Sequence, residues 1–328
     1  MVKTLKQQAE DDLPGYELGI TLGSGGFGEV VVGTNIVSGI KYAIKIIPAT
    51  IDPEDRKMYE QEVKIMHDLS GSSKYLVELV GSKVRLSNWY LIIELALGGE
   101  LGQGSTYKHR EERAKSIVRD ITTGLSTMHG MGIIHSDIKM SNILLKTSDE
   151  NSVAMIADFG LSKYVKDADD TAGGTPGYMA PELKWPGHIA GTEIDIWSLG
   201  ILVWELFFTR RIKIELATTA GTAATIKNFP VNKISLDAER FIKDCLNGDP
   251  KTRMTALEAL DHPWFKNSTP TSAAVQILAA SPAVAAVPDL AAAPARRKAR
   301  VREAAPAAKR QKPNRGLCDK KIRNCSYI

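Results

Sequence analysis

Short apolar stretches separated by glycines and polar residues fill the first part of the chain. Four of them are rich in β-branched and aromatic residues, which is typical of strands: 20–22, 30–32, 42–47 and 90–93. One helix is predicted among them, over 53–69, because its apolar residues recur close to helical spacing. The first part is therefore expected to be a sheet with a single helix.

The pattern becomes helical after Gly98-Gly99. Apolar residues three or four positions apart form one stripe along 110–130, and further helices are predicted over 197–208, 238–246 and 256–260. The chain is thus expected to have an α+β fold with two lobes, a β-rich N-lobe with one helix and a larger helical C-lobe. The connection near 94–99 is a natural hinge beside which a ligand could bind.

Both ends of the chain differ from this central part. Residues 1–15 form a polar leader, and 266–328 form a tail that is rich in Ala, Pro and Ser. Such a tail buries too little apolar surface to offset the entropy of ordering it, so we expect it to be disordered. The net charge of +4 combines −6 over 1–265 with +10 over the tail, which indicates a slightly acidic body with a basic appendage.

The three cysteines are too few and too scattered for a disulfide framework or a zinc site, which indicates a reducing compartment. The first ten residues are polar and lack the apolar core of a secretory signal. The most apolar run, 199–208, contains Glu205 and is much shorter than the roughly 20 residues of a membrane span. We expect it to be a buried helix.

A glycine-rich segment, Gly23-Ser24-Gly25-Gly26-Phe27-Gly28, lies between two predicted strands. Glycine lets backbone amides come close to phosphate oxygens. A dinucleotide site would place such glycines between a strand and a helix. Their position between two strands favours a hairpin that covers the phosphates of a nucleotide.

Lys45 ends an alternating strand, Tyr42-Ala43-Ile44-Lys45, which follows this hairpin. A lysine there can reach the α- and β-phosphates if a carboxylate holds it. Glu62, on the predicted helix 53–69, is the candidate for that carboxylate. Taken alone, each of the two residues is better explained as a solvated surface charge.

The strongest chemical signal is the pair of segments His135-Ser136-Asp137-Ile138-Lys139-Met140-Ser141-Asn142 and Asp158-Phe159-Gly160. Phosphoryl transfer needs a carboxylate that accepts the proton of the incoming hydroxyl, a nearby cation and oxygen ligands for Mg²⁺. Asp137 suits the first role and Lys139 the second. Asn142 and Asp158 suit the third, because Mg²⁺ needs few protein ligands beside phosphate and water. Singly, these residues are explained as turn formers or helix caps, but the ordered set is not.

This ordered set resembles that of eukaryotic-type protein kinases over about 16–265, with an N-lobe at 16–95 and a C-lobe at 96–265. Ala180-Pro181-Glu182 resembles the end of that family's activation segment, which opens at Asp158. The run 195–200 resembles the start of its central buried helix, and Arg253 stands where the family places the partner of Glu182. The resemblance implies a two-lobed kinase fold, ATP and Mg²⁺ as cofactors and proteins as substrates.

The resemblance also implies how the nucleotide is bound. Val30 and Ala43 would cover the adenine, with Leu144 below it. The backbone of 94–96 would bind its edge, and Ile93 would be the gatekeeper. The nucleotide-binding residues expected in this way are Leu22, Gly23, Gly25, Gly28, Val30, Ala43, Lys45, Glu94, Ala96, Glu100 and Leu144.

Two further roles follow from the same resemblance. Glu100 would contact the ribose or a basic residue of the substrate. A hydrophobic spine would align the two lobes, although ordinary core packing predicts the same burial for its three apolar members. The spine would consist of Met66, Leu79, Phe159 and His135.

Lys139, two residues after Asp137, matches the serine/threonine branch of the family. The loop 174–179 resembles the substrate-binding loop of the calcium/calmodulin-dependent group and its checkpoint-kinase relatives. No calcium loop of the Asp-x-Asp-x-Asp-Gly kind is found in the sequence, and prolines break the tail too often for a calmodulin-binding helix. The sequence therefore gives no indication of calcium control.

Two departures from the family pattern stand out. The usual His-Arg-Asp is His135-Ser136-Asp137 here, and a serine cannot form the charge-assisted bond that an arginine forms with a phosphate on the activation segment. We therefore expect activity to depend less than in relatives on phosphorylation of Thr171 or Thr175. The segment 209–229 also lacks the usual Gly-x-x-Pro-Phe pattern, which leaves substrate docking there open.

Two alternatives to an active protein kinase are a pseudokinase scaffold and a small-molecule kinase. A pseudokinase scaffold would bind ATP without efficient transfer, but Lys45, Asp137, Asn142 and Asp158 are all present. A small-molecule kinase on the same fold is disfavoured by the substrate-binding loop and by 180–182.

The basic tail carries two targeting signals that conflict with each other. The clusters 296–300 and 309–312 resemble a bipartite nuclear import signal, which predicts an import receptor as a partner and the nucleus as the location. A solvated charge run or a non-specific nucleic-acid contact is the alternative, and no direct role in nucleic-acid binding is required.

Cys325, four residues from the end and preceded by basic residues, resembles a prenylation site. Tyr327 fits that signal poorly, and Cys318 is a second candidate lipid site. Lipidation would place the protein on membranes, and without either signal it would stay in the cytoplasm.

Overall fold

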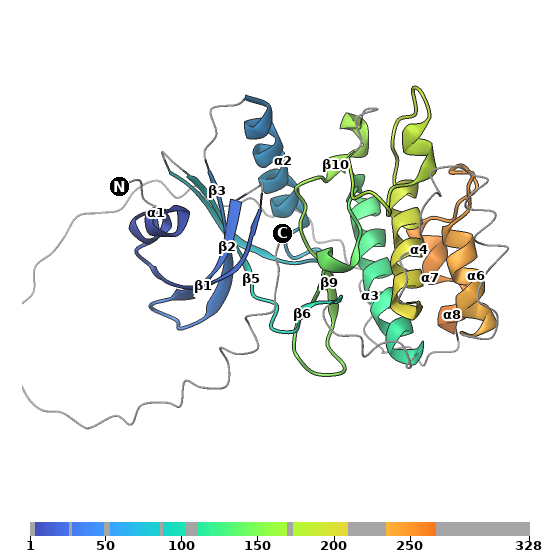
Figure 1. Ribbon diagram of the computed structural model, residues 1–328, viewed down its shortest axis with the longest axis horizontal. Helices are drawn as coiled ribbons and strands as arrows, with labels where there is room; N and C mark the ends of the chain where they lie inside the picture. Colours follow the sequence, from blue (N-terminus) through green and yellow to red (C-terminus); the bar gives the residue numbers. More distant parts are fainter. Residues whose placement is uncertain are drawn as a thin grey trace, which may run out of the picture.

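The computed structural model describes residues 4–266 except 26–27, 49–52, 86–87, 103–110, 169–172 and 209–233. Figure 1 shows a sheet-containing lobe beside a helical lobe, joined by an extended connection. Several sequence predictions lie outside the described residues: those for Gly26 and Phe27, for Thr171, for 209–229, and for the tail with its two basic clusters and Cys325.

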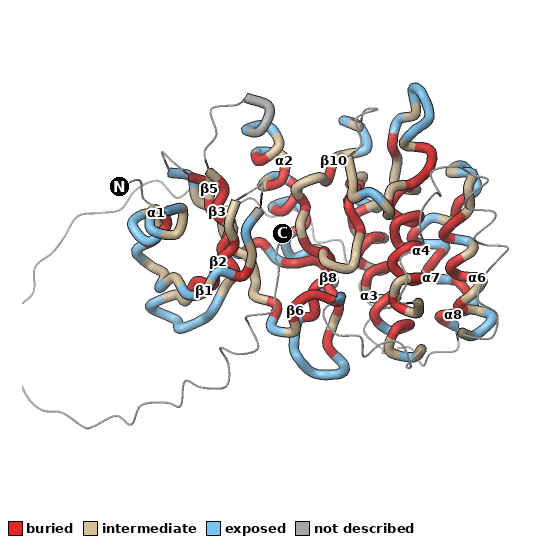
Figure 2. The backbone as a smooth tube through the Cα atoms, viewed as in Figure 1, coloured by how far each residue is buried: buried red, intermediate tan, exposed pale blue. Residues whose placement is uncertain are grey.

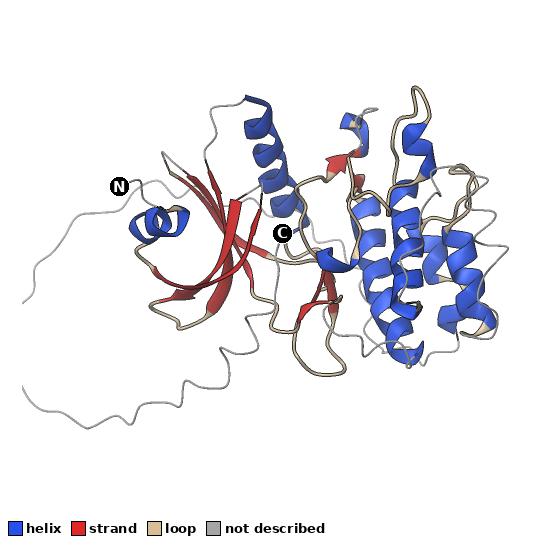
Figure 3. Ribbon diagram, viewed as in Figure 1, coloured by secondary structure: helices blue, strands red, loops and turns tan. Residues whose placement is uncertain are grey.

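The N-lobe is built on an antiparallel five-stranded sheet with the strand order β1-β2-β3-β5-β4. Figure 3 shows these strands gathered at one end of the molecule, with α2 beside them. The strands are β1 (Tyr16–Gly25), β2 (Gly28–Asn35), β3 (Lys41–Pro48), β4 (Leu79–Val84) and β5 (Asn88–Glu94), and the helix is α2 (Pro53–Leu69).

Alternation along β2 and β3 gives the sheet two different faces. Val31, Ile44 and Ile46 belong to one buried apolar cluster, whereas Val30 and Ala43 belong to another. Successive side chains of a strand point to opposite faces of the sheet. Lys45 therefore shares the face of Ala43, which is the face that covers the nucleotide pocket described below.

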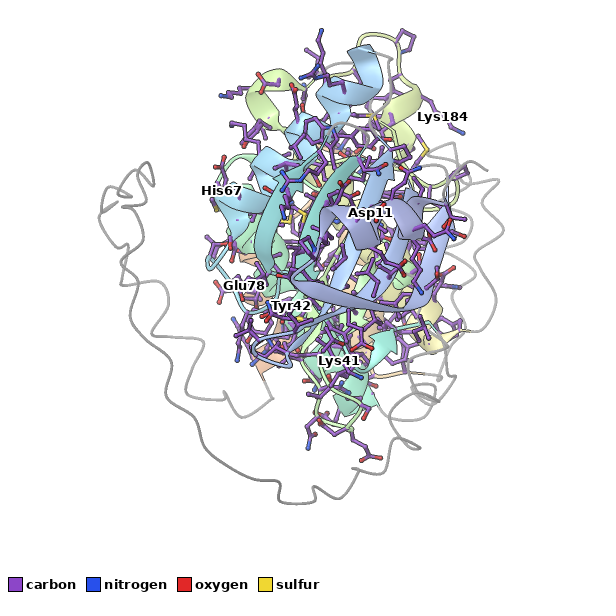
Figure 4. All side chains as sticks on the ribbon, turned by 90° about the vertical axis from the view of Figure 1, so that its left-hand side faces the viewer. Asp11, Lys41, Tyr42, His67, Glu78 and Lys184 are labelled. Carbon is purple, nitrogen blue, oxygen red and sulfur yellow. The ribbon has the colours of Figure 1, made fainter. Side chains whose placement is uncertain are left out.

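A short helix, α1 (Leu5–Asp12), occupies the other face of the sheet. It begins with a capping box in which the side chains of Thr4 and Gln7 each accept a hydrogen bond from the other's backbone amide. Ala9 and Leu13 are buried against the sheet, and the Tyr90 hydroxyl donates to Asp12 Oδ2 at 2.6 Å. In Figure 4, α1, which carries the labelled Asp11, lies in front of the strands. The polar leader expected at 1–15 thus contains a folded, docked helix.

The C-lobe packs its helices around α3 and α4. Ile194 to Leu206 of α4 are buried almost throughout, as expected for a helix that is apolar on all sides. Figure 2 shows this burial along both helices. The helices are α3 (Glu111–Gly130), α4 (Glu193–Phe207), α6 (Leu236–Cys245), α7 (Ala256–Leu260) and α8 (Pro263–Lys266), with 3-10 turns η2 (Met140–Asn142), η3 (Val165–Asp167) and η4 (Pro181–Lys184).

Short strands between the lobes support the loops that carry the candidate site. One small sheet has the order β6-β8-β9, and a two-stranded ladder pairs β10 with β7. These strands are β6 (Gly99–Glu100), β7 (Ile133–Ile134), β8 (Ile143–Leu145), β9 (Ala154–Ile156) and β10 (Lys163–Tyr164). Within the described residues, none of the helices has the length and apolar character that crossing a bilayer requires.

Candidate active site

A pocket opens between the sheet of the N-lobe and the loops above α3. Its empty space is about 490 Å³, including open solvent at its mouth. Eleven residues line it: Val30, Lys45, Glu62, Met66, Val77, Ile93, Ser141, Asn142, Leu144, Ala157 and Asp158. Residues predicted from the sequence to bind a nucleotide and to hold a metal ion therefore share one cavity.

Its roof and floor are separate apolar clusters. Leu22, Val30 and Ala43 are buried together on the inner face of the sheet. Ala96 and Leu144 are buried together on the opposite side. A flat apolar ring between these clusters would be covered on both faces.

Lys45 forms the charged end of the pocket. Its Nζ lies 2.6 Å from Glu62 Oε1 and 3.5 Å from Asp158 Oδ1. Burial alone would lower the pKa of Lys45, but Glu62 and Asp158 outweigh that effect and raise it. The lysine therefore remains a cation where the sequence predicted a phosphate contact.

Asp137 lies at the centre of a second polar cluster. Its Oδ2 accepts from Lys139 Nζ at 2.7 Å, and its Oδ1 accepts from the Thr175 amide and hydroxyl at 2.9 and 2.7 Å. Burial alone would raise the pKa of Asp137, but the bonds from Lys139 and Thr175 outweigh it and lower the pKa. The carboxylate is therefore ionised at neutral pH and can accept a proton.

Asn142 and Asp158 fit the role of divalent-cation ligands. Asn142 Nδ2 donates to the backbone oxygen of Asp137 at 2.8 Å and to its Oδ2 at 3.1 Å. This fixes the amide so that its oxygen, the atom a hard cation prefers, points away from Asp137. Both residues line the pocket, the space that a triphosphate would fill.

The loop that carries Asp137 is hydrogen-bonded to a buried carboxylate on α4. Asp195 Oδ2 accepts from the His135 amide at 2.8 Å and lies 2.9 Å from His129 Nε2, and its Oδ1 accepts from the Ser136 amide at 2.9 Å. Ser136 has φ +68°, in the left-handed region that non-glycine residues seldom adopt. The hydrogen bonds from both amides to Asp195 stabilise this unusual backbone conformation.

The chain matches the protein kinase domain family over residues 16–265. It belongs to the protein kinase family. It is 36% identical over 270 residues to calcium/calmodulin-dependent protein kinase cmkB of Emericella nidulans, covering 76% of this chain and 65% of that protein. It is 34% identical over 274 residues to calcium/calmodulin-dependent protein kinase type I of Schizosaccharomyces pombe, covering 79% and 80%.

A plant relative, calcium-dependent protein kinase 34 of Arabidopsis thaliana, is 35% identical over 274 residues, covering 80% of this chain and 52% of that protein. The chain thus spans between about half and four fifths of the length of these relatives. They confirm the resemblance to the serine/threonine branch and to its calcium/calmodulin-dependent group.

Other predicted residues of the kinase have clear positions but untested roles. Gly23 pairs with Val30 across the hairpin, and Gly25 pairs with Gly28. Gly28 has φ +125°, and a Cβ there would lie 2.1 Å from the Ile46 carbonyl oxygen, so the position requires glycine.

The hinge residues contribute in different ways. The Glu94 carboxylate accepts from Lys146 Nζ at 2.8 Å and from the Glu78 amide at 3.0 Å. Its side chain therefore links the hinge to Lys146 and to the backbone before β4. Contact between its backbone and adenine stays a prediction. Glu100 is buried on β6 opposite Leu144, next to the floor of the pocket, and its contact with ribose or substrate also stays a prediction.

The expected hydrophobic spine is buried as a unit. Met66, Leu79 and Phe159 belong to the main core cluster. The rings of His135 and Phe159 pack edge to face, with their centroids 5.6 Å apart. Core packing alone would also bury the three apolar members, so this burial does not distinguish a spine from ordinary core.

Sequence reasoning missed two supporting residues. Thr175 was considered as a phosphorylation site, yet its hydroxyl binds Asp137 and accepts from Lys139 Nζ at 3.0 Å. Asp195 was recognised only as the start of a helix. A carboxylate near the start of a largely apolar helix is the signal that could have marked it, because a buried charge requires partners.

Proposed function

We propose that this kinase transfers the γ-phosphate of Mg-ATP to serine and threonine hydroxyls of protein substrates. The observation that carries the proposal is that two charged clusters are joined at one pocket. Lys45 and Glu62 line the pocket on the side of the N-lobe. On the side of the C-lobe, the Asp137–Lys139 pair is linked to it by Asn142, which lines the pocket and donates to Asp137. One side suits a triphosphate and the other an incoming hydroxyl.

Each residue has a definite task in this reaction. Asp137, ionised and fixed by Thr175, accepts the hydrogen bond of the substrate hydroxyl and then its proton. Lys139 places its positive charge beside the phosphoryl group that is being transferred. Bound Mg-ATP supplies the phosphoryl group and the metal that offsets its charge. Asn142 and Asp158 would hold that metal.

The test is phosphate transfer from labelled ATP to a generic protein substrate by the full-length chain. Removal of a positioned acid–base group typically costs about 10²–10⁴ in rate, so Asp137→Asn should nearly silence the enzyme. Asp149→Asn, which changes an exposed carboxylate in the loop before β9, is the matched control. An Asp137→Asn variant as active as wild type would overturn the mechanism.

The same assay separates the alternatives. A pseudokinase would bind ATP but give no labelled protein, and a small-molecule kinase would label only small acceptors. Phosphoamino-acid analysis of the product tests the preference for serine and threonine, and a peptide library tests for arginine upstream of the acceptor, as expected from Glu100. Adding calcium and calmodulin tests control by the ligands for which the relatives are named.

We propose that phosphorylation of the activation segment contributes little to activity. Position 136 offers no guanidinium to a phosphate, and the Thr175 hydroxyl is already bound to Asp137. Thr171→Ala should therefore retain most of the wild-type rate. A hundredfold loss would reject the proposal.

We propose the nucleus as the location of this kinase, through the basic clusters 296–300 and 309–312. A reporter fused to residues 290–315 should accumulate in nuclei, and a purely cytoplasmic reporter would end the proposal. Cys325→Ser in the full chain separates import from lipidation, because only a lipidated protein would leave membranes when this cysteine is changed.

A further inference from the structure

A polar cluster joins α2 to the activation segment at Tyr164. The Tyr164 hydroxyl donates to Asp68 Oδ2 at 2.5 Å and accepts from Lys64 Nζ at 2.8 Å. Lys64 Nζ also lies 4.1 Å from the centre of the Tyr164 ring and 3.5 Å from Asp68 Oδ2. One turn earlier, Gln61 Nε2 donates to the Ser162 carbonyl oxygen at 2.7 Å. We call these five residues the Tyr164 clasp.

The clasp lies along one stripe of α2. Gln61, Lys64 and Asp68 are three and four residues apart, so they occupy neighbouring positions on one face of the helix. Glu62 lies on a different face, where it is only 3% exposed and holds Lys45. One face of α2 therefore binds the activation segment while another completes the nucleotide site.

Tyr164 is also tied to the catalytic loop through its backbone. It pairs with Ile133 in the β7–β10 ladder, and Ile133 stands two residues before His135. The backbone amide of Val165, the residue after Tyr164, donates to the Gly132 carbonyl oxygen at 2.8 Å. A rotation of α2 that separated Glu62 from Lys45 would have to break the clasp or pull this ladder.

The clasp needs no phosphate group. Burial, together with the Asp68 carboxylate, raises the pKa of the Tyr164 hydroxyl, so it keeps its proton and remains the donor to Asp68. The hydrogen bonds of the clasp are formed by the ordinary side chains, and the catalytic loop has Ser136 where a cation would be needed to bind a phosphate.

We propose that Tyr164 is a positioning residue that keeps α2 turned toward Lys45, and thus supports ATP binding without phosphorylation of the activation segment. The proposal rests on the function proposed above and concerns the same site. It assigns to a side chain outside the pocket a control over the Lys45–Glu62 ion pair.

The first test is the affinity for Mg-ATP, measured by calorimetry on full-length protein. Tyr164→Phe removes one partly exposed hydrogen-bonding hydroxyl, so ATP binding and kcat/KM for ATP should fall about three- to tenfold. Tyr75→Phe is the matched control, because it removes a phenol hydroxyl that forms no hydrogen bond within the described residues. It should leave both values unchanged. Unaltered ATP affinity in Tyr164→Phe would overturn the proposal.

The second test asks whether Tyr164 acts through Glu62. In a Glu62→Ala background Lys45 has lost its partner already, so the effect of Tyr164→Phe on ATP affinity should shrink below about twofold. A merely structural role would give the same factor in both backgrounds and would refute the inference. Asp68→Ala should resemble Tyr164→Phe and should not add to it.

These readouts also separate the two proposals. A wild-type protein that binds Mg-ATP but transfers no phosphate would refute the proposed function and leave the affinity cycle readable. A wild-type protein that transfers phosphate but shows additive effects of Tyr164 and Glu62 would refute only the role of Tyr164. Melting temperatures of each variant show whether it is folded under the conditions of the assay.

Discussion

The ion pair between Glu182 and Arg253 gives the sharpest test of how this kinase is held together. Both side chains are 0% exposed, and Arg253 Nη2 lies 3.0 Å from Glu182 Oε2 while Nη1 contacts Oε1. Arg253 also donates to the carbonyl oxygens of Glu193 and Asn247, each at 2.9 Å, and its guanidinium lies 5.1 Å from the centre of the Trp197 ring. The pair joins the end of the activation segment to the loop before α7.

Removing one partner should be far more damaging than removing both. Arg253→Met would leave the Glu182 carboxylate buried without its cation, and two backbone oxygens would lose their donor. Breaking a buried pair in this way costs about 3–5 kcal/mol. For a domain of this size, that corresponds to a melting temperature lower by roughly 6–20 °C. Replacing both partners with apolar side chains removes the uncompensated charge.

The assay is urea unfolding of the wild type, Glu182→Leu, Arg253→Met and the double variant. We expect each single variant to lose about 3–5 kcal/mol and the double variant to recover at least about half of the summed loss. The control is Arg56→Met, since Arg56 pairs with Glu60 on the exposed surface of α2 and such pairs contribute at most about 1 kcal/mol. Single variants that lose less than about 1 kcal/mol, or a double variant whose loss equals the sum, would refute the reasoning.

Three further predictions concern stability and nucleotide binding. Leu13→Ala empties a buried site under α1 and should cost about 2–5 kcal/mol, with faster amide hydrogen exchange in α1; unchanged exchange would contradict the docking. Burial raises the pKa of Asp120 to about 6, so its contribution to stability is full below about pH 4 and is lost as the pH rises to about 6. Asp120→Asn should therefore be about 3 kcal/mol more stable than wild type at pH 7 in denaturant titrations, and equal stability there would argue against this shift. Gly28→Ala should weaken ATP binding at least about tenfold because its Cβ would collide with the Ile46 carbonyl, whereas Gly81→Ala, which meets nothing within 4 Å, should not.

Much of the fold follows from local patterns in the sequence. The helix predicted over 53–69 is α2 with the same bounds, and the prediction for 256–260 matches α7. Strands at 30–32 and 42–47 lie within β2 and β3. These elements have regular spacing of apolar residues, so their period alone identifies them.

Elements that depend on distant contacts were not predicted. β4 contains Gly81, Ser82 and Lys83 and has little strand character of its own, so its pairing with β5 defines it. α1 has only Ala9 and Leu13 to bury, too few for a periodic signal. Its capping box at Thr4 and Gln7 was the available sign of a helix start.

The candidate site shows the same division. Lys45 with Glu62 and Glu182 with Arg253 were predicted as pairs, and the distances confirm both. These pairs could be assigned because ordered motifs mark them. Asp195 supports the catalytic loop from sixty residues away, and no local pattern reports such a contact.

The attachment of the catalytic loop to Asp195 has a consequence for turnover. The loop that carries Asp137 and Asn142 is fastened to α4, because Asp195 of that helix accepts hydrogen bonds from two of its backbone amides. Lys45 belongs to the other lobe and reaches Asp158 only across 3.5 Å. Opening of the two lobes would therefore release the product nucleotide, while Asp137 and Asn142 stay in place for the next acceptor hydroxyl.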